Sequence, residues 1–153
     1  MNELIQQFDT ALVPQWERHP VPTSNSITHI ESCLDFRIPS ELIAFARLSA
    51  SYGSFFLSLG EDYASDSHIL EKNRSIRMNE HWLEQGPPAP EHLIFITDNF
   101  MTDSFWCLDI SEKIGTYPVV LWSPAMTPRQ KSRRYGNFCE FVSDQIKYYE
   151  KTK

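Results

Sequence analysis

Glycine is scarce in this sequence, with five residues among 153. The chain has no G-x-S-x-G elbow, no Walker loop and no G-x-G-x-x-G fingerprint, and it also lacks the H-E-x-x-H pair of zinc hydrolases. Its five histidines are scattered, and no two of them stand four residues apart as a helical zinc pair does. These absences argue against a nucleotide-dependent enzyme and against a metal site, and we expect no cofactor.

Cysteine and long apolar runs are also sparse. Cys33, Cys107 and Cys139 are odd in number and form no C-x-x-C pair, so the sequence predicts neither a disulfide framework nor a zinc knuckle. The first residues include the acidic Glu3 and lack the basic start and unbroken apolar run of a signal peptide. No apolar run approaches the roughly 20 residues that cross a bilayer. We therefore expect a cytoplasmic protein that does not associate with membranes.

Positive charge is rare before residue 113. Residues 1–112 hold 17 acids and 6 bases (net -11), whereas residues 113–153 hold 3 acids and 8 bases (net +5), which gives the chain its net charge of -6. An acidic body of this kind repels nucleic acid, so direct DNA or RNA binding is disfavoured. A basic protein partner is favoured instead.

What the sequence does contain is enough apolar material for one core. Hydrophobic residues make up 41% of the chain and aromatic residues 13%, which is typical of a folded globular protein. The length suits one domain over residues 1–153. Helical spacing of apolar residues predicts helices over 2–17, around 27–34, from Pro39 onward and over 137–150, with the first and last packing on the same core.

Strand patterns occupy the second half of the chain. Alternating or continuous apolar runs predict strands over 93–98, 104–109 and 117–122, with a further strand over 54–60. Residues 93–98 carry apolar side chains on both faces, which predicts a central strand. The pattern of residues 68–84 fits a helix or a strand. The simplest architecture is α+β, an antiparallel meander of about four to five strands packed against flanking helices.

Three features offer candidate chemistry. Asp98 precedes and Asp103 ends a five-residue hairpin loop, residues 99–103, so they fit either a pair of catalytic carboxylates or the polar ends of a turn. Asp109 stands too far along its strand to join them. Trp106 and Trp122, on adjacent predicted strands, are expected to stack on one sheet face, either within the core or as anchors of an interface.

The order of these segments resembles one known family. "IESCLDFRIPSELIAFARLSASYGS", then "PPAPEHLIFITDNFMTDSFWCLDIS", then "YPVVLW" and the terminal "GNFCEFVSDQI" are similar to the SUKH superfamily of Smi/Knr type, over roughly residues 27–147. The sequence departs from the family pattern at Ser54, Phe100 and Met101, where relatives usually have glycine. Two large apolar residues in an exposed turn are typical of a contact surface.

The resemblance implies a non-enzymatic bacterial immunity protein that binds a cognate protein toxin in the producing cell. Many such toxins are nucleases or deaminases, and an acidic protein suits a basic toxin. The alternatives are a regulatory scaffold that binds host proteins, as the yeast relatives suggest, and a small hydrolase that uses Asp98 and Asp103. We expect partner contacts at Glu61, Asp62, Tyr63, Asp98, Phe100, Met101, Asp103 and Trp122.

Overall fold

A computed structural model describes residues 1–12, 18–79, 83–84, 86, 88–97, 104–111, 116–124 and 134–152. Its helices are α1 (Asn2–Ala11), α2 (Ser24–Leu34), α3 (Ser40–Leu48), the 3-10 helix η1 (Tyr52–Ser54), α4 (Ile69–Arg77) and α6 (Phe138–Lys151), and its strands are β1 (Leu93–Phe95), β2 (Phe105–Asp109), β3 (Val119–Trp122) and β4 (Arg134–Tyr135). Among these described segments, no helix is long and apolar enough to cross a membrane.

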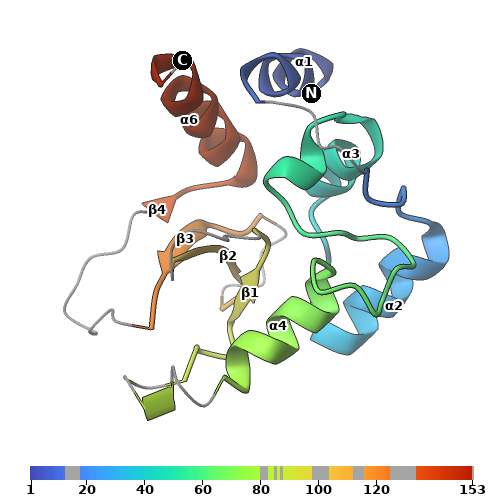
Figure 1. The fold of residues 1–153 in the computed structure, drawn as a ribbon, viewed down its shortest axis with the longest axis vertical. Helices are drawn as coiled ribbons and strands as arrows, with labels where there is room; N and C mark the ends of the chain where they lie inside the picture. Colours follow the sequence, from blue (N-terminus) through green and yellow to red (C-terminus); the bar gives the residue numbers. More distant parts are fainter. Residues whose placement is uncertain are drawn as a thin grey trace.

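The four strands form one antiparallel sheet in the order β1-β2-β3-β4. The predicted α+β meander is therefore confirmed. In Figure 1, α6 lies above the sheet beside α1, and α4 lies below it, next to α2. Both chain termini lie at the same end of the molecule in this view.

Residues 69–77 are helical, which answers the question that the sequence left open for this part of residues 68–84. Ile69, Asn73 and Ile76 are the buried side chains of this helix. Their spacing of three and four residues places them on one side of α4, as an amphipathic helix requires.

The N-terminal helix is shorter than predicted. It ends at Ala11, because Leu12 has an extended backbone with φ -106° and ψ 153°. Residues 13–17 lie outside the described residues. The early end agrees with Pro14, which disfavours helical geometry in the residue before it. The prediction that one helix runs from residue 2 to residue 17 is therefore wrong, because the helix is already broken at Leu12.

Aromatic rings join the helices to one another. The ring of Phe45 in α3 lies 5.5 Å from that of Phe8 in α1 and 5.4 Å from that of Phe138 in α6, both in edge-to-face contact. Phe56 contacts Phe138 at 5.5 Å. Because edge-to-face rings attract through their quadrupoles as well as by burial, this cluster fixes α1, α3 and α6 against each other.

The strand predicted over residues 54–60 does not form as a ladder. Residues 52–54 are a 3-10 turn, and Phe56 and Ser58 make only isolated bridges, to Thr97 and His68. The predicted central position of strand 93–98 is also wrong, because β1 is an edge strand of the sheet. Its residues are nonetheless buried, and the Phe56 segment pairs with Thr97 just beyond the end of β1.

The two sheet faces carry different tryptophans. Phe105 pairs with Trp122 and Trp106 pairs with Leu121 across β2 and β3, so Trp106 and Trp122 point to opposite faces. The Trp106 ring contacts Phe141 of α6 at 4.8 Å, whereas the Trp122 ring contacts Phe95 at 5.4 Å. The predicted stacking of the two tryptophans is therefore wrong.

Candidate interaction surface

The acidic turn, residues 61–66, is held in place by a buried histidine. His68 is fully buried, and its Nδ1 accepts a hydrogen bond from the N–H of Leu70 at 3.1 Å, which caps α4. Its Nε2 lies 2.8 Å from the carbonyl oxygen of Gly60. Because Nδ1 accepts, Nε2 must carry the proton and donate it to Gly60. One neutral imidazole thus ties the start of the turn to the start of α4.

Burial lowers the pKa of His68, and the nearby His19 and His29 lower it further. The hydrogen bond to Gly60 and the charge of Asp62 act in the opposite direction but do not outweigh burial. The neutral form that the hydrogen bonds require is therefore also the form that burial favours.

Two of the acids in the turn also have structural contacts. Asp62 Oδ1 accepts a hydrogen bond from the Ser58 hydroxyl at 2.6 Å, and Glu61 Oε1 accepts one from the Thr23 hydroxyl at 2.9 Å. Thr23 also caps α2, because its hydroxyl accepts from the N–H of Ser26. Glu61 and Asp66 are exposed, and Asp62 is half-buried. The turn therefore presents carboxylates from a backbone that is fixed on several sides.

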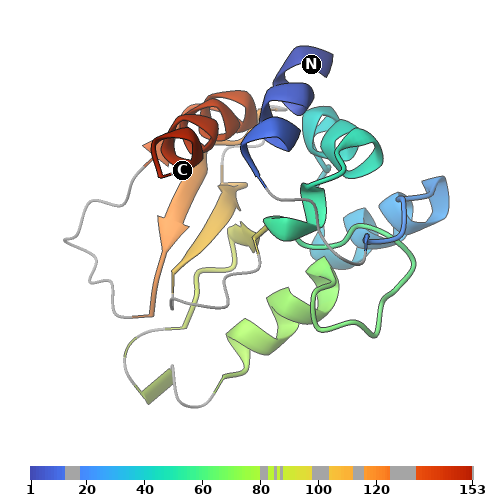
Figure 2. The same cartoon turned by 45° about the horizontal axis from the view of Figure 1, so that its top comes forward.

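Tyr63 joins the acidic turn to α2. Its ring lies between two histidines, 4.8 Å from His29 of α2 and 5.1 Å from His68, both in edge-to-face contact. Partial burial, and then the charges of Glu61 and Cys33, raise the pKa of its hydroxyl. In Figures 1 and 2 the segment that carries the turn passes beside α2 before it enters α4.

A groove of about 440 Å³ continues this surface between α2, α4 and the start of β1. Its apolar lining consists of Cys33, Leu34, Leu70 and Ile94, and its charged lining consists of Arg74, Arg77 and Glu91. This volume falls within the range of about 300–1,000 Å³ that is usual for binding clefts. The groove lies close to the acidic turn, because Cys33 lines the groove and its sulfur lies 3.8 Å from Nε2 of His29, whose ring contacts that of Tyr63.

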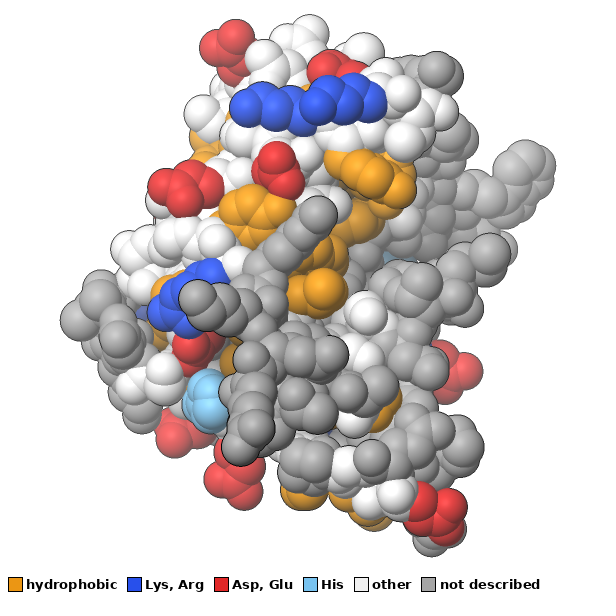
Figure 3. Space-filling view, turned by 90° about the vertical axis from the view of Figure 1, so that its left-hand side faces the viewer, with side chains coloured by type: hydrophobic (Ala, Val, Ile, Leu, Met, Phe, Trp, Pro, Cys, Tyr) orange, Lys and Arg blue, Asp and Glu red, His pale blue; other side chains and the backbone are white. Residues whose placement is uncertain are grey.

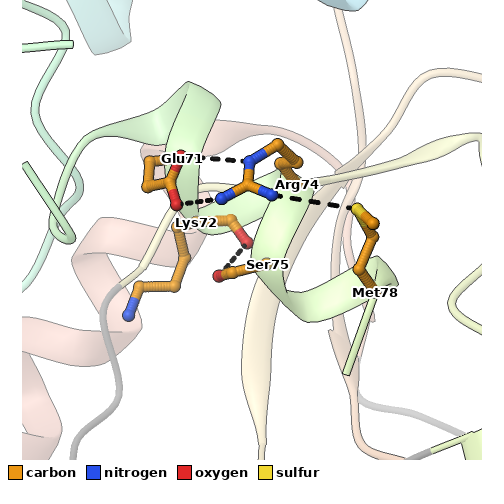
Figure 4. A network of polar contacts seen from close by, with 5 residues as sticks. All are labelled: Glu71, Lys72, Arg74, Ser75 and Met78. Atoms are coloured by element: carbon orange, nitrogen blue, oxygen red, sulfur yellow. Dashed lines mark hydrogen bonds and ion pairs between the residues drawn. The ribbon is translucent and has the colours of Figure 1, made fainter. Parts of the chain in front are cut away.

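The outer side of α4 carries a fixed network of polar side chains (Figure 4). Arg74 forms an ion pair with Glu71, and its Nη1 lies 3.8 Å from the sulfur of Met78. The Ser75 hydroxyl donates to the carbonyl of Lys72 at 3.2 Å. The ion pair is exposed, so it stabilises α4 only slightly, but it orients the Arg74 guanidinium at the edge of the groove.

The second arginine of the groove is bound differently. Arg77 donates to the carbonyl of Asn73 at 3.2 Å and to the Asn73 side-chain oxygen at 3.1 Å, and it also donates to the carbonyl of Leu93. Its guanidinium carbon lies 5.5 Å from the centre of the Phe95 ring. Burial lowers the pKa of Arg77, although Cys107 and Glu91 partly oppose this. All of these hydrogen-bond acceptors are neutral.

The structure brings together only some of the residues expected at the interface. Glu61, Asp62 and Tyr63 lie on one surface with α2 and α4. Trp122 is half-buried on the sheet, in contact with Phe95. Asp98, Phe100, Met101 and Asp103 lie outside the described residues, so their contacts with a partner stay a prediction.

Asp109 has a structural role that sequence reasoning did not identify. It accepts hydrogen bonds from the N–H and the hydroxyl of Ser111, and it forms an ion pair with Arg134 at 3.1 Å. Its pKa is lowered, because these hydrogen bonds together outweigh the opposing effect of burial, which is the largest single one. Asp109 thus joins β2 to β4.

Sequence reasoning also missed the groove. Its signal was weak, because Leu34 and Leu70 have the spacing of ordinary core residues and are half-buried in the structure. Arg74 and Arg77 are three residues apart, which places them on neighbouring positions of one helix. That spacing was the available clue to a cationic edge.

A different side of the molecule is shown in Figure 3. Described apolar side chains gather there beneath a row of cations, with acidic side chains among them. Because cations and anions are mixed on this surface, it does not present an electrostatic potential of a single sign. No group of three or more potential metal ligands occurs anywhere in the part of the chain that the structure describes.

Comparison with known proteins identifies the fold and a family model. The model of the SMI1 / KNR4 family (SUKH-1) matches residues 22–144. A crystal structure of a protein from Pseudomonas syringae pv. tomato superimposes with a TM-score of 0.63 and 20% sequence identity, over 94% of this chain and 96% of the other. No curated protein sequence matches the chain. At this identity, the structural likeness concerns the fold alone.

Proposed function

Because the chain belongs to the SMI1 / KNR4 family (SUKH-1), we propose that it is an immunity protein that binds and neutralises a cognate protein toxin. The observation that carries the proposal beyond the family is the acidic turn. Three carboxylates, those of Glu61, Asp62 and Asp66, lie within six residues of a turn that His68 and Ser58 hold rigid.

A rigid acidic turn suits a basic toxin for two physical reasons. Its negative potential speeds the encounter with a positive surface, and this steering falls as salt screens the charges. A carboxylate that is already held in place also loses less conformational entropy when the complex forms. A stable complex buries roughly 1,600 Å², so the turn forms only part of the interface.

Growth rescue tests the proposal directly. The toxin to be used is the product of the gene next to the one that encodes this chain, expressed inside a sensitive host. Co-expression of the wild-type chain is expected to restore growth, and the purified pair is expected to form a complex of defined stoichiometry. Absence of both rescue and complex with that toxin would contradict an immunity role and favour the regulatory scaffold.

A double variant, Glu61→Gln with Asp66→Asn, tests the part that the acidic turn plays in toxin binding. It removes two negative charges but keeps the size of both side chains and the oxygen that accepts from Thr23. An exposed charge pair at the edge of an interface is worth about 0.2–1 kcal/mol. The loss of two such pairs should therefore weaken toxin affinity about two- to thirty-fold, mainly through a slower association rate. Glu150→Gln on α6 is the control, because Glu150 is an exposed acid on another element. An equal effect of the control would remove the acidic turn from the interface.

A further inference from the structure

The groove between α2 and α4 combines an apolar floor with a positive edge. Leu34 and Leu70 are half-buried and Ile94 is 2% exposed. The lining contains two arginines and one carboxylate, that of Glu91. These three lining residues carry a net charge of +1. Arg74 is already paired with Glu71, so Arg77 is the lining cation without a carboxylate partner among the described residues.

The charge of Arg77 is the specific feature of this edge. Its hydrogen bonds go to neutral oxygens of Asn73 and Leu93, and none of the described carboxylates lies within ion-pair distance of its guanidinium. The groove residue Glu91 acts on it only through a longer-range interaction that raises its pKa. A half-buried cation of this kind gains from an incoming anion, because partial burial weakens solvent screening.

We propose that this groove docks a segment of the partner protein in which an aliphatic side chain stands next to a carboxylate. The aliphatic group contacts Leu34, Leu70 and Ile94, and the carboxylate faces Arg74 and Arg77. The inference rests on the proposed function, since the segment belongs to the toxin. It adds that the toxin is not uniformly basic over its contact area.

The neighbouring acidic turn makes this arrangement selective. Glu61 and Asp66 attract a basic group at one end of the surface, and the arginines attract an acidic group at the other end. A partner with these charges reversed meets repulsion at both ends. Paired attraction and repulsion of this kind fixes the orientation of a complex and excludes wrong partners.

Short synthetic peptides test the chemistry of the groove without the toxin. The probes are acetyl-Glu-Leu-Leu-Glu-amide, its Gln-Leu-Leu-Gln analogue and its Lys-Leu-Leu-Lys analogue, each titrated into the full chain and followed by amide NMR shifts. We expect the acidic peptide to shift the amides of Leu34, Leu70 and Arg77 and to bind about five-fold more tightly than the neutral peptide, as one to two exposed charge pairs allow. The basic peptide should bind more weakly than the neutral one.

Matched variants separate charge from fold. Arg74→Gln removes one of the two edge charges and leaves that of Arg77, so it should reduce the preference for the acidic over the neutral peptide. Arg47→Gln, at an exposed arginine on α3, should leave this preference unchanged. Equal binding of all three peptides, stronger binding of the basic peptide, or no shift in the groove would each overturn the proposal. Such a failure leaves the growth-rescue result intact, so it is distinguishable from a failure of the immunity function.

Discussion

Asn73 of α4 forms two hydrogen bonds with the backbone of Phe95, at the outer edge of β1. Its side-chain oxygen accepts from the N–H of Phe95 and its side-chain nitrogen donates to the carbonyl of Phe95, both at 2.9 Å. The same nitrogen also donates to the carbonyl of Ile69 at 2.8 Å. An amide side chain thus takes the place of a neighbouring strand, and it satisfies an edge that would otherwise pair with another chain.

Replacement of Asn73→Leu is expected to destabilise the protein by about 2–4 kcal/mol. The volume is similar, but the N–H and C=O of Phe95 lose their partner at a site where Asn73 is only 1% exposed, and each unsatisfied buried group costs about 1–3 kcal/mol. Urea unfolding followed by circular dichroism measures this. Ser75→Ala, on the exposed side of the same helix, should change the free energy of unfolding by less than about 0.5 kcal/mol. Similar values for the two variants would contradict the structural role of Asn73.

Gly60 is a position where any side chain meets the backbone of another segment. A Cβ atom there would lie 2.7 Å from the carbonyl oxygen of Pro20 and 2.9 Å from its Cβ. Neither neighbour is the end of a flexible side chain, so the two segments must separate. We expect Gly60→Ala to cost about 1–3 kcal/mol, the usual penalty for overpacking.

The comparison for this substitution is Gly136→Ala, where the nearest atoms are the side-chain oxygens of Glu140 at 3.1 and 3.6 Å. That side chain can move, so the expected loss of thermal stability is small. The measurement is the midpoint of thermal unfolding of both variants, compared with that of the wild type. If Gly60→Ala unfolds at the wild-type temperature, the contact between the acidic turn and the segment at Pro20 is not close-packed.

Local pattern predicted the hairpin of β1 and β2, because their apolar runs are short and bounded by polar turns. It wrongly placed both tryptophans on one sheet face, because the face depends on register. Trp106 pairs with Leu121 and not with Trp122, and a shift of one residue exchanges the faces. The groove was unpredictable for a similar reason. It requires Cys33, Leu70 and Ile94 to meet from three segments that are distant in the sequence.

The buried asparagine shows the same limit. Judged from its neighbours in the sequence alone, Asn73 would be a polar residue on the surface of a helix. Its partner lies 22 residues away in the sequence, and only the packing of α4 against β1 brings them together. By contrast, the acidic character of residues 61–66 is a local property that the sequence shows directly, whereas the contacts of Glu61, Asp62 and Tyr63 with a partner stay a prediction.

The neutral state of His68 makes stability depend on pH. An unfolded histidine has a pKa of about 6.5, and burial lowers the pKa of His68 in the folded protein. Above pH 6.5 neither state binds the proton, so the stabilisation is fully present. As pH falls below 6.5, the unfolded state takes up a proton that the folded state resists, and stability falls by at most about 1.4 kcal/mol per pH unit until the folded pKa is passed.

Urea unfolding of the wild type should therefore give a lower free energy of unfolding at pH 5.5 than at pH 7.5. In the variant His68→Asn most of this difference should disappear. Asparagine can still cap α4 by accepting from the N–H of Leu70, but it has no proton to gain. His92→Gln should keep the wild-type pH dependence, because His92 is exposed. Protonation at His68 Nδ1 would break the hydrogen bond from Leu70, so the acid-induced loss should begin at the acidic turn. If wild type and His68→Asn lose the same stability between these pH values, His68 does not carry the effect.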